Sequence, residues 1–244
     1  MLSPIATGAC AALGVAGAVG LVAGGYSYAA LWPGSQIFGK AMTAPQRSGE
    51  LALTFDDGPN PAWTPQLLDT LAEYDIKASF FLMGSRAQEQ PALVRKMVDA
   101  GHLIGNHSWS HPNLARSVAS KVRRELTQTK DVLEQITGGP VKYFRPPFGA
   151  RRPVVFRIAR ELGMKVVLWN AMTSDWSEPS GDQIASALME KIDGLERRGC
   201  AANIVLHDGG HLDSRAARGP SVMAAGLLSA RYASTHRFVT LEAW

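Results

Sequence analysis

The sequence predicts an α/β fold with a parallel sheet, in which strands and helices alternate from residue 48 to residue 244. Two observations predict it. Short apolar runs alternate with longer segments whose apolar residues recur every three to four positions. Pro opens three of the longer segments and Gly follows three of them, as is common at helix starts and ends. Seven strands and six helices fit either an open doubly wound sheet or a closed (β/α) barrel.

The predicted strands are the short runs Leu51 to Phe55, Ala78 to Met83, Leu103 to Asn106, Val141 to Phe144, Val166 to Trp169, Ala202 to Leu206 and Phe238 to Leu241. Three helices should begin where Pro follows Thr64, Gln90 and Arg152. Gly at a helix end suits a left-handed conformation, which we expect at Gly101, Gly138 and Gly163. Further helices are expected over Ser117 to Thr137, Asp182 to Arg198 and Pro220 to Tyr232.

The first 39 residues contain no Asp, Glu, Lys or Arg. Within them, Ile5 to Trp32 is an apolar run longer than the ~20 residues that a helix needs to cross a bilayer. We therefore expect a membrane-anchor or signal segment over residues 1–39, a linker over 40–47 and a single domain over 48–244. A signal peptide cleaved near Ala29 and a buried Ala- and Gly-rich helix are the alternatives.

Charge and cysteine content limit the classes of partner. The net charge of +4 is small for 244 residues, and basic residues alternate with acidic ones, so no nucleic acid is expected. Cys10 and Cys200 are the two cysteines and lie far apart in the sequence, so they form no disulfide framework. We expect a monomer.

Ionisable residues gather where the predicted strands end. They follow the first, third, fourth, fifth and sixth strands, and they are Asp56, Asp57, His107, His111, Arg145, Asp175 and His207. The carboxyl ends of parallel strands meet at one edge of a sheet or barrel, where functional groups collect. We therefore expect these side chains to form one site.

Two motifs in this set predict a metal site. Asp56 and Asp57 are adjacent at a strand end and should point opposite ways, so one can reach a metal and the other the reacting water. Asp57 alone would equally fit a turn. His107 and His111 are four residues apart, and Pro112 favours a looped turn over a regular helix. Two imidazoles and one carboxylate leave metal positions open for water and substrate, as catalysis needs.

The span from Leu51 to Trp244 resembles the polysaccharide deacetylase family, carbohydrate esterase family 4, through five motifs in order. These are TFDDGP, HSWSH, FRPPFG, the pair Asp175-Trp176, and IVLHD. The resemblance implies a distorted (β/α)7 barrel, here preceded by the N-terminal apolar helix. It therefore favours the barrel over the doubly wound sheet. Phe148 replaces a usual Tyr, and Met172 stands where the family often has an additional acid.

The resemblance assigns roles to the polar residues of the first three motifs. It implies that Asp56 is the general base and that Arg145 orients it. It implies that one divalent metal ion is bound by Asp57, His107 and His111. Zn²⁺ is the expected ion, with Co²⁺, Ni²⁺ and Mn²⁺ as alternatives.

The remaining motifs would complete the site. The backbone amide of Phe148 would help to hold the oxyanion, and Asp175 would tune His207, the implied general acid. His211 follows the last motif in a Gly-rich loop, and the sequence assigns it no role. The substrate-binding residues expected beside the acid and the oxyanion amide are Trp176, Pro147 and Leu206.

The activity implied by the resemblance is removal of N-acetyl groups from GlcNAc-containing glycans, peptidoglycan or chitin oligomers, by water that the metal activates. Removal of an O-acetyl group, as from acetylated xylan, or of an N-formyl group is the alternative. A carbohydrate-binding protein without catalysis is a third interpretation, but it would have no use for an acid and a base. We expect a membrane-anchored or secreted protein with an extracytoplasmic catalytic domain, which Lys40 and Arg47 oppose through the positive-inside tendency.

Overall fold

The computed structural model describes residues 23–177 and 180–244 of the chain. Within these residues, eight parallel strands form one sheet. The strands are β1 (Glu50–Gly58), β2 (Ser79–Leu82), β3 (Leu103–Asn106), β4 (Tyr143–Phe144), β5 (Lys165–Val166), β6 (Ala171–Met172), β7 (Ala202–His207) and β8 (Arg237–Phe238).

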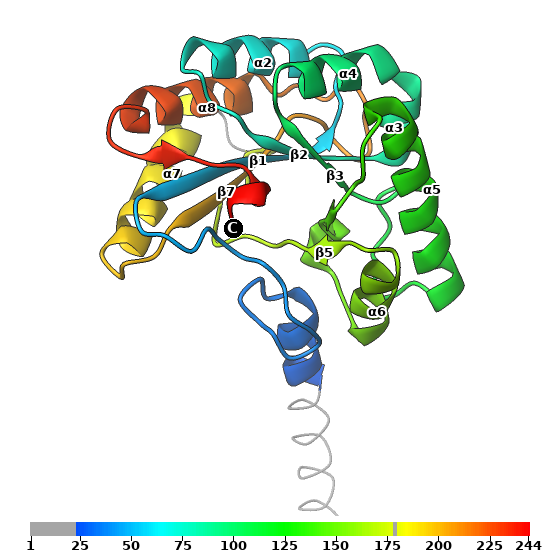
Figure 1. Ribbon diagram of the computed structural model, residues 1–244. Coiled ribbons are helices and arrows are strands. Elements are labelled where there is room, and N and C mark those ends of the chain that lie inside the picture. The colour runs from blue at the N-terminus through cyan, green and yellow to red at the C-terminus, as the bar shows by residue number, and fades with distance from the viewer. Residues whose placement is uncertain (1–22, 178–179) are drawn as a thin grey trace, which may run out of the picture.

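The sheet curves into a partly open barrel with helices outside it (Figure 1). Its order is β5-β4-β3-β2-β1-β7-β6, with β8 paired to β1, so β5 and β6 stand at the two ends. Met42 extends the β5 side: its N–H donates to Val166 O, and Leu168 N–H donates to Met42 O at 2.8 Å. The predicted distorted (β/α)7 barrel is confirmed.

Several details of the predicted strands are wrong. The fourth strand begins at Tyr143 rather than Val141. The fifth strand ends at Val166 rather than Trp169. The carbonyl of Leu168 instead accepts hydrogen bonds from the side chains of Asn203, at 2.6 Å, and Arg145, at 3.3 Å. β6 was not predicted, because two residues show no periodicity. The last strand ends at Phe238, and a 3-10 helix covers Leu241–Ala243.

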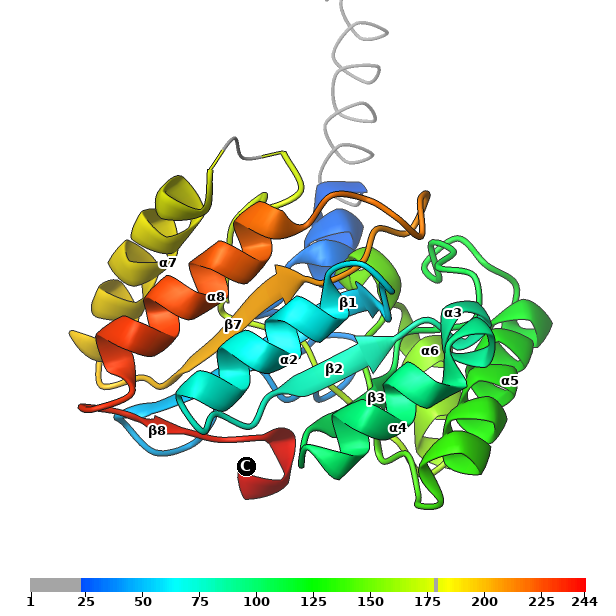
Figure 2. The same ribbon diagram turned by 90° about the horizontal axis from the view of Figure 1, so that it is seen from above.

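The helices cover the outside of the sheet, and Figure 2 shows α2 and α8 side by side. They are α2 (Thr64–Glu73), α3 (Gly84–Glu89), α4 (Pro91–Asp99), α5 (Ala119–Thr137), α6 (Pro153–Glu161), α7 (Gly181–Glu196) and α8 (Gly219–Tyr232). The starts marked by Pro are confirmed, and Gly101, Gly138 and Gly163 have φ of 82°, 71° and 73°, as predicted. α3 was not predicted, since six residues hold too little of a helical pattern.

The N-terminal apolar run is described only in part. Residues 23–31 are helical, with Ala29 and Ala30 buried against the rest of the protein. Residues 5–22 of the expected membrane segment lie outside the described residues. In the described ranges, no helix combines the length and the apolar character that crossing a bilayer requires. The division into residues 1–39, 40–47 and 48–244 stays a prediction.

The core lies between the sheet and the helices, and its large side chains include Phe55 of β1 and Phe80 of β2. Phe55 and Phe80 are fully buried and stack with ring centroids 5.1 Å apart. Burying a side chain of this size contributes roughly 1.5–3 kcal/mol. This packing fixes β1 at the centre of the sheet, so residues at its carboxyl end have defined positions.

Candidate active site

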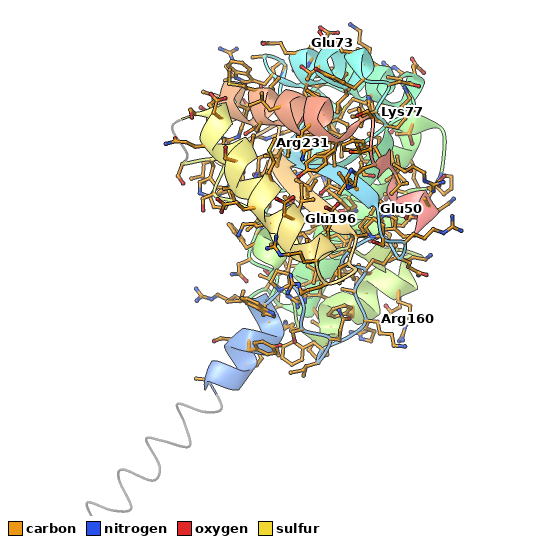
Figure 3. All side chains as sticks on the ribbon, turned by 90° about the vertical axis from the view of Figure 1, so that its left-hand side faces the viewer. Glu50, Glu73, Lys77, Arg160, Glu196 and Arg231 are labelled. Atoms are coloured by element: carbon orange, nitrogen blue, oxygen red, sulfur yellow. The ribbon has the colours of Figure 1, made fainter. Side chains whose placement is uncertain are left out.

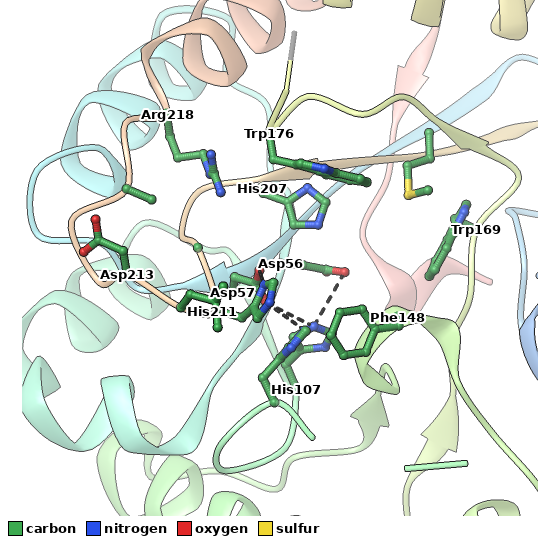
Figure 4. Close-up of a pocket in the computed structure, with 15 residues that line it drawn as sticks. Asp56, Asp57, His107, Phe148, Trp169, Trp176, His207, His211, Asp213 and Arg218 are labelled. Carbon is green, nitrogen blue, oxygen red and sulfur yellow. Dashed lines mark ion pairs between the residues drawn. The ribbon is translucent and has the colours of Figure 1, made fainter. Parts of the chain in front are cut away.

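A pocket of about 490 Å³ opens at the carboxyl ends of β1, β3 and β7 (Figure 4). Of the residues predicted for the site, those that line it are Asp56, Asp57, His107, His111, Phe148, Trp176 and His207. Arg145 and Asp175 lie buried directly behind them. Leu206 belongs to the hydrophobic core and Pro147 is buried, and neither lines the pocket.

The end of β1 departs from regular strand geometry at Asp57. Its φ is 70°, and the pairing with β2 shifts register between Asp56 and Gly58. Such a β-bulge re-aims side chains. The expectation that the two acids point opposite ways is therefore wrong, because the bulge turns both carboxylates into one pocket.

Two glycines allow the chain to pack tightly around this bulge. A Cβ on Gly58 would lie 2.2 Å from Asp208 Oδ2, and a Cβ on Gly209 would lie 2.1 Å from the carbonyl oxygen of Asp57. Neither position can hold a larger residue without movement of the backbone or of a buried acid. The loop after β7 therefore lies directly against the end of β1.

His107 and His111 lie on an irregular turn after β3, as Pro112 predicted. Ser108 and His111 have φ of 65° and 56°. A residue other than Gly in this region costs roughly 1–3 kcal/mol, and such strain is often found at functional sites. The turn brings the two imidazole centroids to 5.0 Å from each other.

Asp57, His107 and His111 form a buried group, here called the metal trio, whose donor atoms lie within 4.8 Å of one another. Asp57 Oδ1 is 3.4 Å from His107 Nε2 and 3.2 Å from His111 Nε2, and no hydrogen-bond donor satisfies it among the described residues. His107 Nδ1 donates to the carbonyl of Arg145 at 2.8 Å, which makes Nε2 the ligand atom of the neutral imidazole. Acceptor atoms of two imidazoles and one carboxylate thus converge on one point, and a bound cation would satisfy them.

The protonation states of Asp57 and His111 suit metal binding. Burial opposes charge on Asp57, but the surrounding imidazoles bring its pKa well below the usual range. Burial lowers the pKa of His111 to about 3, so this imidazole is neutral. Metal ligands must be deprotonated, and both residues meet that condition at neutral pH.

Asp56 is held by a fully buried arginine. Arg145 Nη1 donates to Asp56 Oδ1 at 2.7 Å and to Thr54 Oγ1 at 2.9 Å. The guanidinium also stacks over the Phe81 ring, 4.1 Å from its centroid. These contacts fix the orientation of the Asp56 carboxylate and leave its Oδ2 directed toward His107 Nε2, 4.0 Å away.

His207 is held by a buried carboxylate, that of Asp175. Its Nδ1 donates to Asp175 Oδ1 at 2.7 Å, its backbone N–H donates to Asp175 Oδ2, and Ser221 Oγ donates to the same oxygen. Burial alone would lower the pKa of His207, but the Asp175 charge and hydrogen bond raise it to about 9. His207 is therefore protonated at neutral pH, and Nε2 is left for the pocket.

Aromatic side chains form much of the pocket rim. Phe148 has a φ of 59°, and its half-exposed ring meets His111 edge-on at 4.5 Å. Trp176 is also half exposed and meets His207 edge-on at 5.1 Å. Exposed aromatic faces at a pocket rim suit the apolar faces of sugar rings.

His211 is a site residue that the sequence analysis missed. Its ring stacks on His111 with centroids 4.5 Å apart, and its Nδ1 lies 3.8 Å from Asp57 Oδ2. Arg86 and Arg218 hold its loop by donating to the carbonyls of Gly210 and Gly209. A single His in a Gly-rich loop carries no local signal, and only the contact of this loop with β1 brings it to the metal trio.

Comparison with known proteins agrees with the geometry. Residues 43–167 match the family described as Polysaccharide deacetylase. A peptidoglycan-N-acetylglucosamine deacetylase of Bacillus cereus is 38% identical over 61% of this chain, and the match spans 54% of that relative's length. A chitooligosaccharide deacetylase of Azorhizobium caulinodans is 33% identical, over 71% of this chain and 80% of that protein. A solved structure of a peptidoglycan N-acetylglucosamine deacetylase is 33% identical with a TM-score of 0.73, covering 83% and 91% of the two chains.

Proposed function

Because the chain belongs to the polysaccharide deacetylase family, we propose that it hydrolyses N-acetyl groups of a GlcNAc-containing glycan, either peptidoglycan or chitin oligomers. One observation carries the proposal: Asp56 and His207 are register neighbours on β1 and β7, and each is paired with a buried partner of opposite charge. Arg145 and Asp175 are those partners. A base and a proton donor thus stand beside the metal trio in one pocket.

Asp56 is the general base in this proposal. Arg145 occupies its Oδ1, so Oδ2 is the oxygen that takes a proton from water beside the metal trio. A divalent ion bound by the trio would polarise the acetyl carbonyl and lower the pKa of water toward 7. Zn²⁺ is the ion we propose, because imidazole and carboxylate ligands suit it, with Co²⁺, Ni²⁺ and Mn²⁺ as alternatives.

His207 is the general acid. Its Nδ1 is engaged by Asp175, so Nε2 donates the proton to the departing amine. We assign the backbone N–H of Phe148 to the oxyanion, a contribution of roughly 3 kcal/mol for one donor. Trp176 is assigned to stacking on the sugar.

The proposal is tested by acetate release from N-acetylated chitooligosaccharides, peptidoglycan and acetylated xylan, with metal-stripped protein and addition of single metals. We expect release from at least one GlcNAc substrate and recovery with zinc or cobalt. Release from xylan alone would support an O-acetyl esterase, and formate from an N-formylated sugar would support a deformylase. No release from any glycan, together with measurable glycan binding, would support a binding protein.

The alkaline limit of activity should follow His207. The acid must be protonated, so activity is present below the raised pKa and is lost as pH rises through about 9. Asp175→Asn removes the charge that raises this pKa while burial still lowers it, so the limit should fall to near or below 6.5. The pH profile of kcat/KM measures the shift.

Ser221→Ala is the matched control for that experiment. Ser221 donates to Asp175 Oδ2, so its loss leaves the carboxylate and its bond to His207 in place. A small displacement of the alkaline limit is expected. If Asp175→Asn and wild type share the same limit, His207 is not the group that controls it.

We also propose that the protein acts outside the cytoplasm as a membrane-anchored monomer. The uncharged run over residues 5–32 supports the anchor, and peptidoglycan or chitin as the substrate supports the extracytoplasmic side. Lys40 and Arg47 point to the opposite orientation. Protease treatment of intact cells and of spheroplasts distinguishes the two orientations. An extracytoplasmic domain should be digested in spheroplasts, whereas a cytoplasmic domain should be protected.

A further inference from the structure

The helix over residues 23–31 and the turn after it carry an exposed group of large apolar side chains. They are about half exposed or more, and we call them the N-terminal patch: Tyr26, Tyr28, Leu31, Trp32 and Ile37. Two of the rings stack, Tyr28 on Trp32, with centroids 6.3 Å apart. Figure 3 shows the helix projecting from the rest of the protein. Its C-terminal end packs against the domain, where Ala29 and Ala30 are buried.

The position of the patch in the sequence indicates what covers it. It lies between an uncharged stretch over residues 1–25 and the first charged residues, Lys40 and Arg47. Tyr and Trp at such a boundary suit the headgroup region of a bilayer, where one part of the ring is in an apolar environment and the other is hydrated. Exposed Lys40 adds attraction to anionic headgroups.

Arg151 ties this segment to the catalytic domain. Its side chain is fully buried, and its Nη atoms donate to four carbonyls: Ala30 and Gly149 from Nη1, Trp32 and Ser35 from Nη2. Its backbone N–H donates to Ala30 O at 3.0 Å. The carbonyls at a helix C-terminus carry partial negative charge, which favours this cation. The end of the helix is therefore fixed to the loop that contains Gly149.

That loop also carries Phe148 of the pocket rim. Phe148 and Arg151 are three positions apart, and a chain spans at most roughly 3.6 Å per residue, so the helix end that Arg151 binds lies within about 15 Å of the rim. Figure 2 shows the helix leaving the protein on the side toward which β7 points, which is the side of the pocket. The patch and the pocket mouth thus share one side of the molecule.

We propose that the N-terminal patch lies in the headgroup region of a lipid bilayer, and that Arg151 holds the domain there in one orientation, with the pocket on the membrane-facing side. The inference rests on the membrane association proposed above. Its consequence is that the site reaches glycans at the bilayer surface.

Energy transfer from two labelled positions to a headgroup acceptor tests the orientation. The full chain carrying Cys10→Ser is placed in vesicles of phosphatidylcholine and phosphatidylglycerol. One sample is labelled at exposed Cys200, just before β7; the other carries Cys200→Ser and Leu212→Cys, at the pocket rim. The six residues of β7 separate the two regions by about 20 Å. We expect clearly stronger transfer from position 212.

Two sets of variants extend the test. Arg151→Gln should bring the two transfer efficiencies closer together while the protein still floats with the vesicles. Replacing exposed Tyr28 and Trp32 by Ser should do the same without affecting the fold, and this keeps the test valid if Arg151→Gln does not fold. Equal transfer from both positions in the otherwise unaltered chain, or stronger transfer from Cys200, would overturn the orientation. Failure to float with vesicles would overturn membrane association as well, whereas acetate release in detergent tests the enzymatic proposal separately.

Discussion

Asp56→Asn is expected to lower kcat/KM for acetate release roughly 10²- to 10⁴-fold, the usual contribution of a positioned general base. Asparagine has nearly the same shape, and its amide oxygen can still accept from Arg145, so the fold should persist. The metal trio does not include Asp56, so metal content should stay the same. Steady-state kinetics, metal analysis and thermal melting of one preparation measure all three quantities.

Asp208→Asn is the matched control for this substitution. Asp208 is buried next to His207 in sequence and accepts from Thr64 Oγ1, but it does not line the pocket. Burial raises its pKa to about 7, so the neutral amide resembles a form that it already adopts. We expect activity near that of the wild type. If Asp56→Asn retained activity within tenfold of wild type, Asp56 would not be the base.

His107→Ala is expected to abolish stoichiometric metal binding and to reduce acetate release to the level of metal-stripped protein. It removes one of the three ligand atoms of the metal trio, and one of the two imidazole nitrogens beside the unsatisfied Asp57 Oδ1. The same substitution frees the carbonyl of Arg145 from its hydrogen bond. Competition with a chromophoric chelator gives the dissociation constant independently of activity.

His211→Ala provides the graded comparison. His211 contacts Asp57 Oδ2 and stacks on His111 without belonging to the metal trio. Partners outside the ligand set typically change metal affinity about 10- to 100-fold, so a loss in that range is expected, smaller than for His107→Ala. Leu212→Ala, at a fully exposed neighbouring side chain, should leave the affinity unchanged. Equal losses for His107→Ala and His211→Ala would contradict the assignment of the three ligands.

Local sequence patterns determined much of the fold. The apolar run of β1 and the Pro and Gly residues around the helices act through the conformational preferences of a few adjacent residues, which are visible in one sequence. They located the central strands and most helix ends. They did not reveal β6 or the early end of β5, because hydrogen bonds from Asn203 and Arg145 to Leu168 O depend on residues far along the chain.

The candidate site, like the fold, could be predicted from the sequence only in part. By itself the sequence determined which ionisable residues stand at strand ends, and the order of the motifs supplied expectations for their roles. Only the tertiary structure decided that both Asp56 and Asp57 face the pocket. The β-bulge at Asp57, where φ is positive, depends on the loop after β7, which packs against Gly58. It also brought His211 to Asp57 and Arg151 to the N-terminal helix. These contacts join segments far apart in the chain, and such contacts leave no periodic trace in a single sequence.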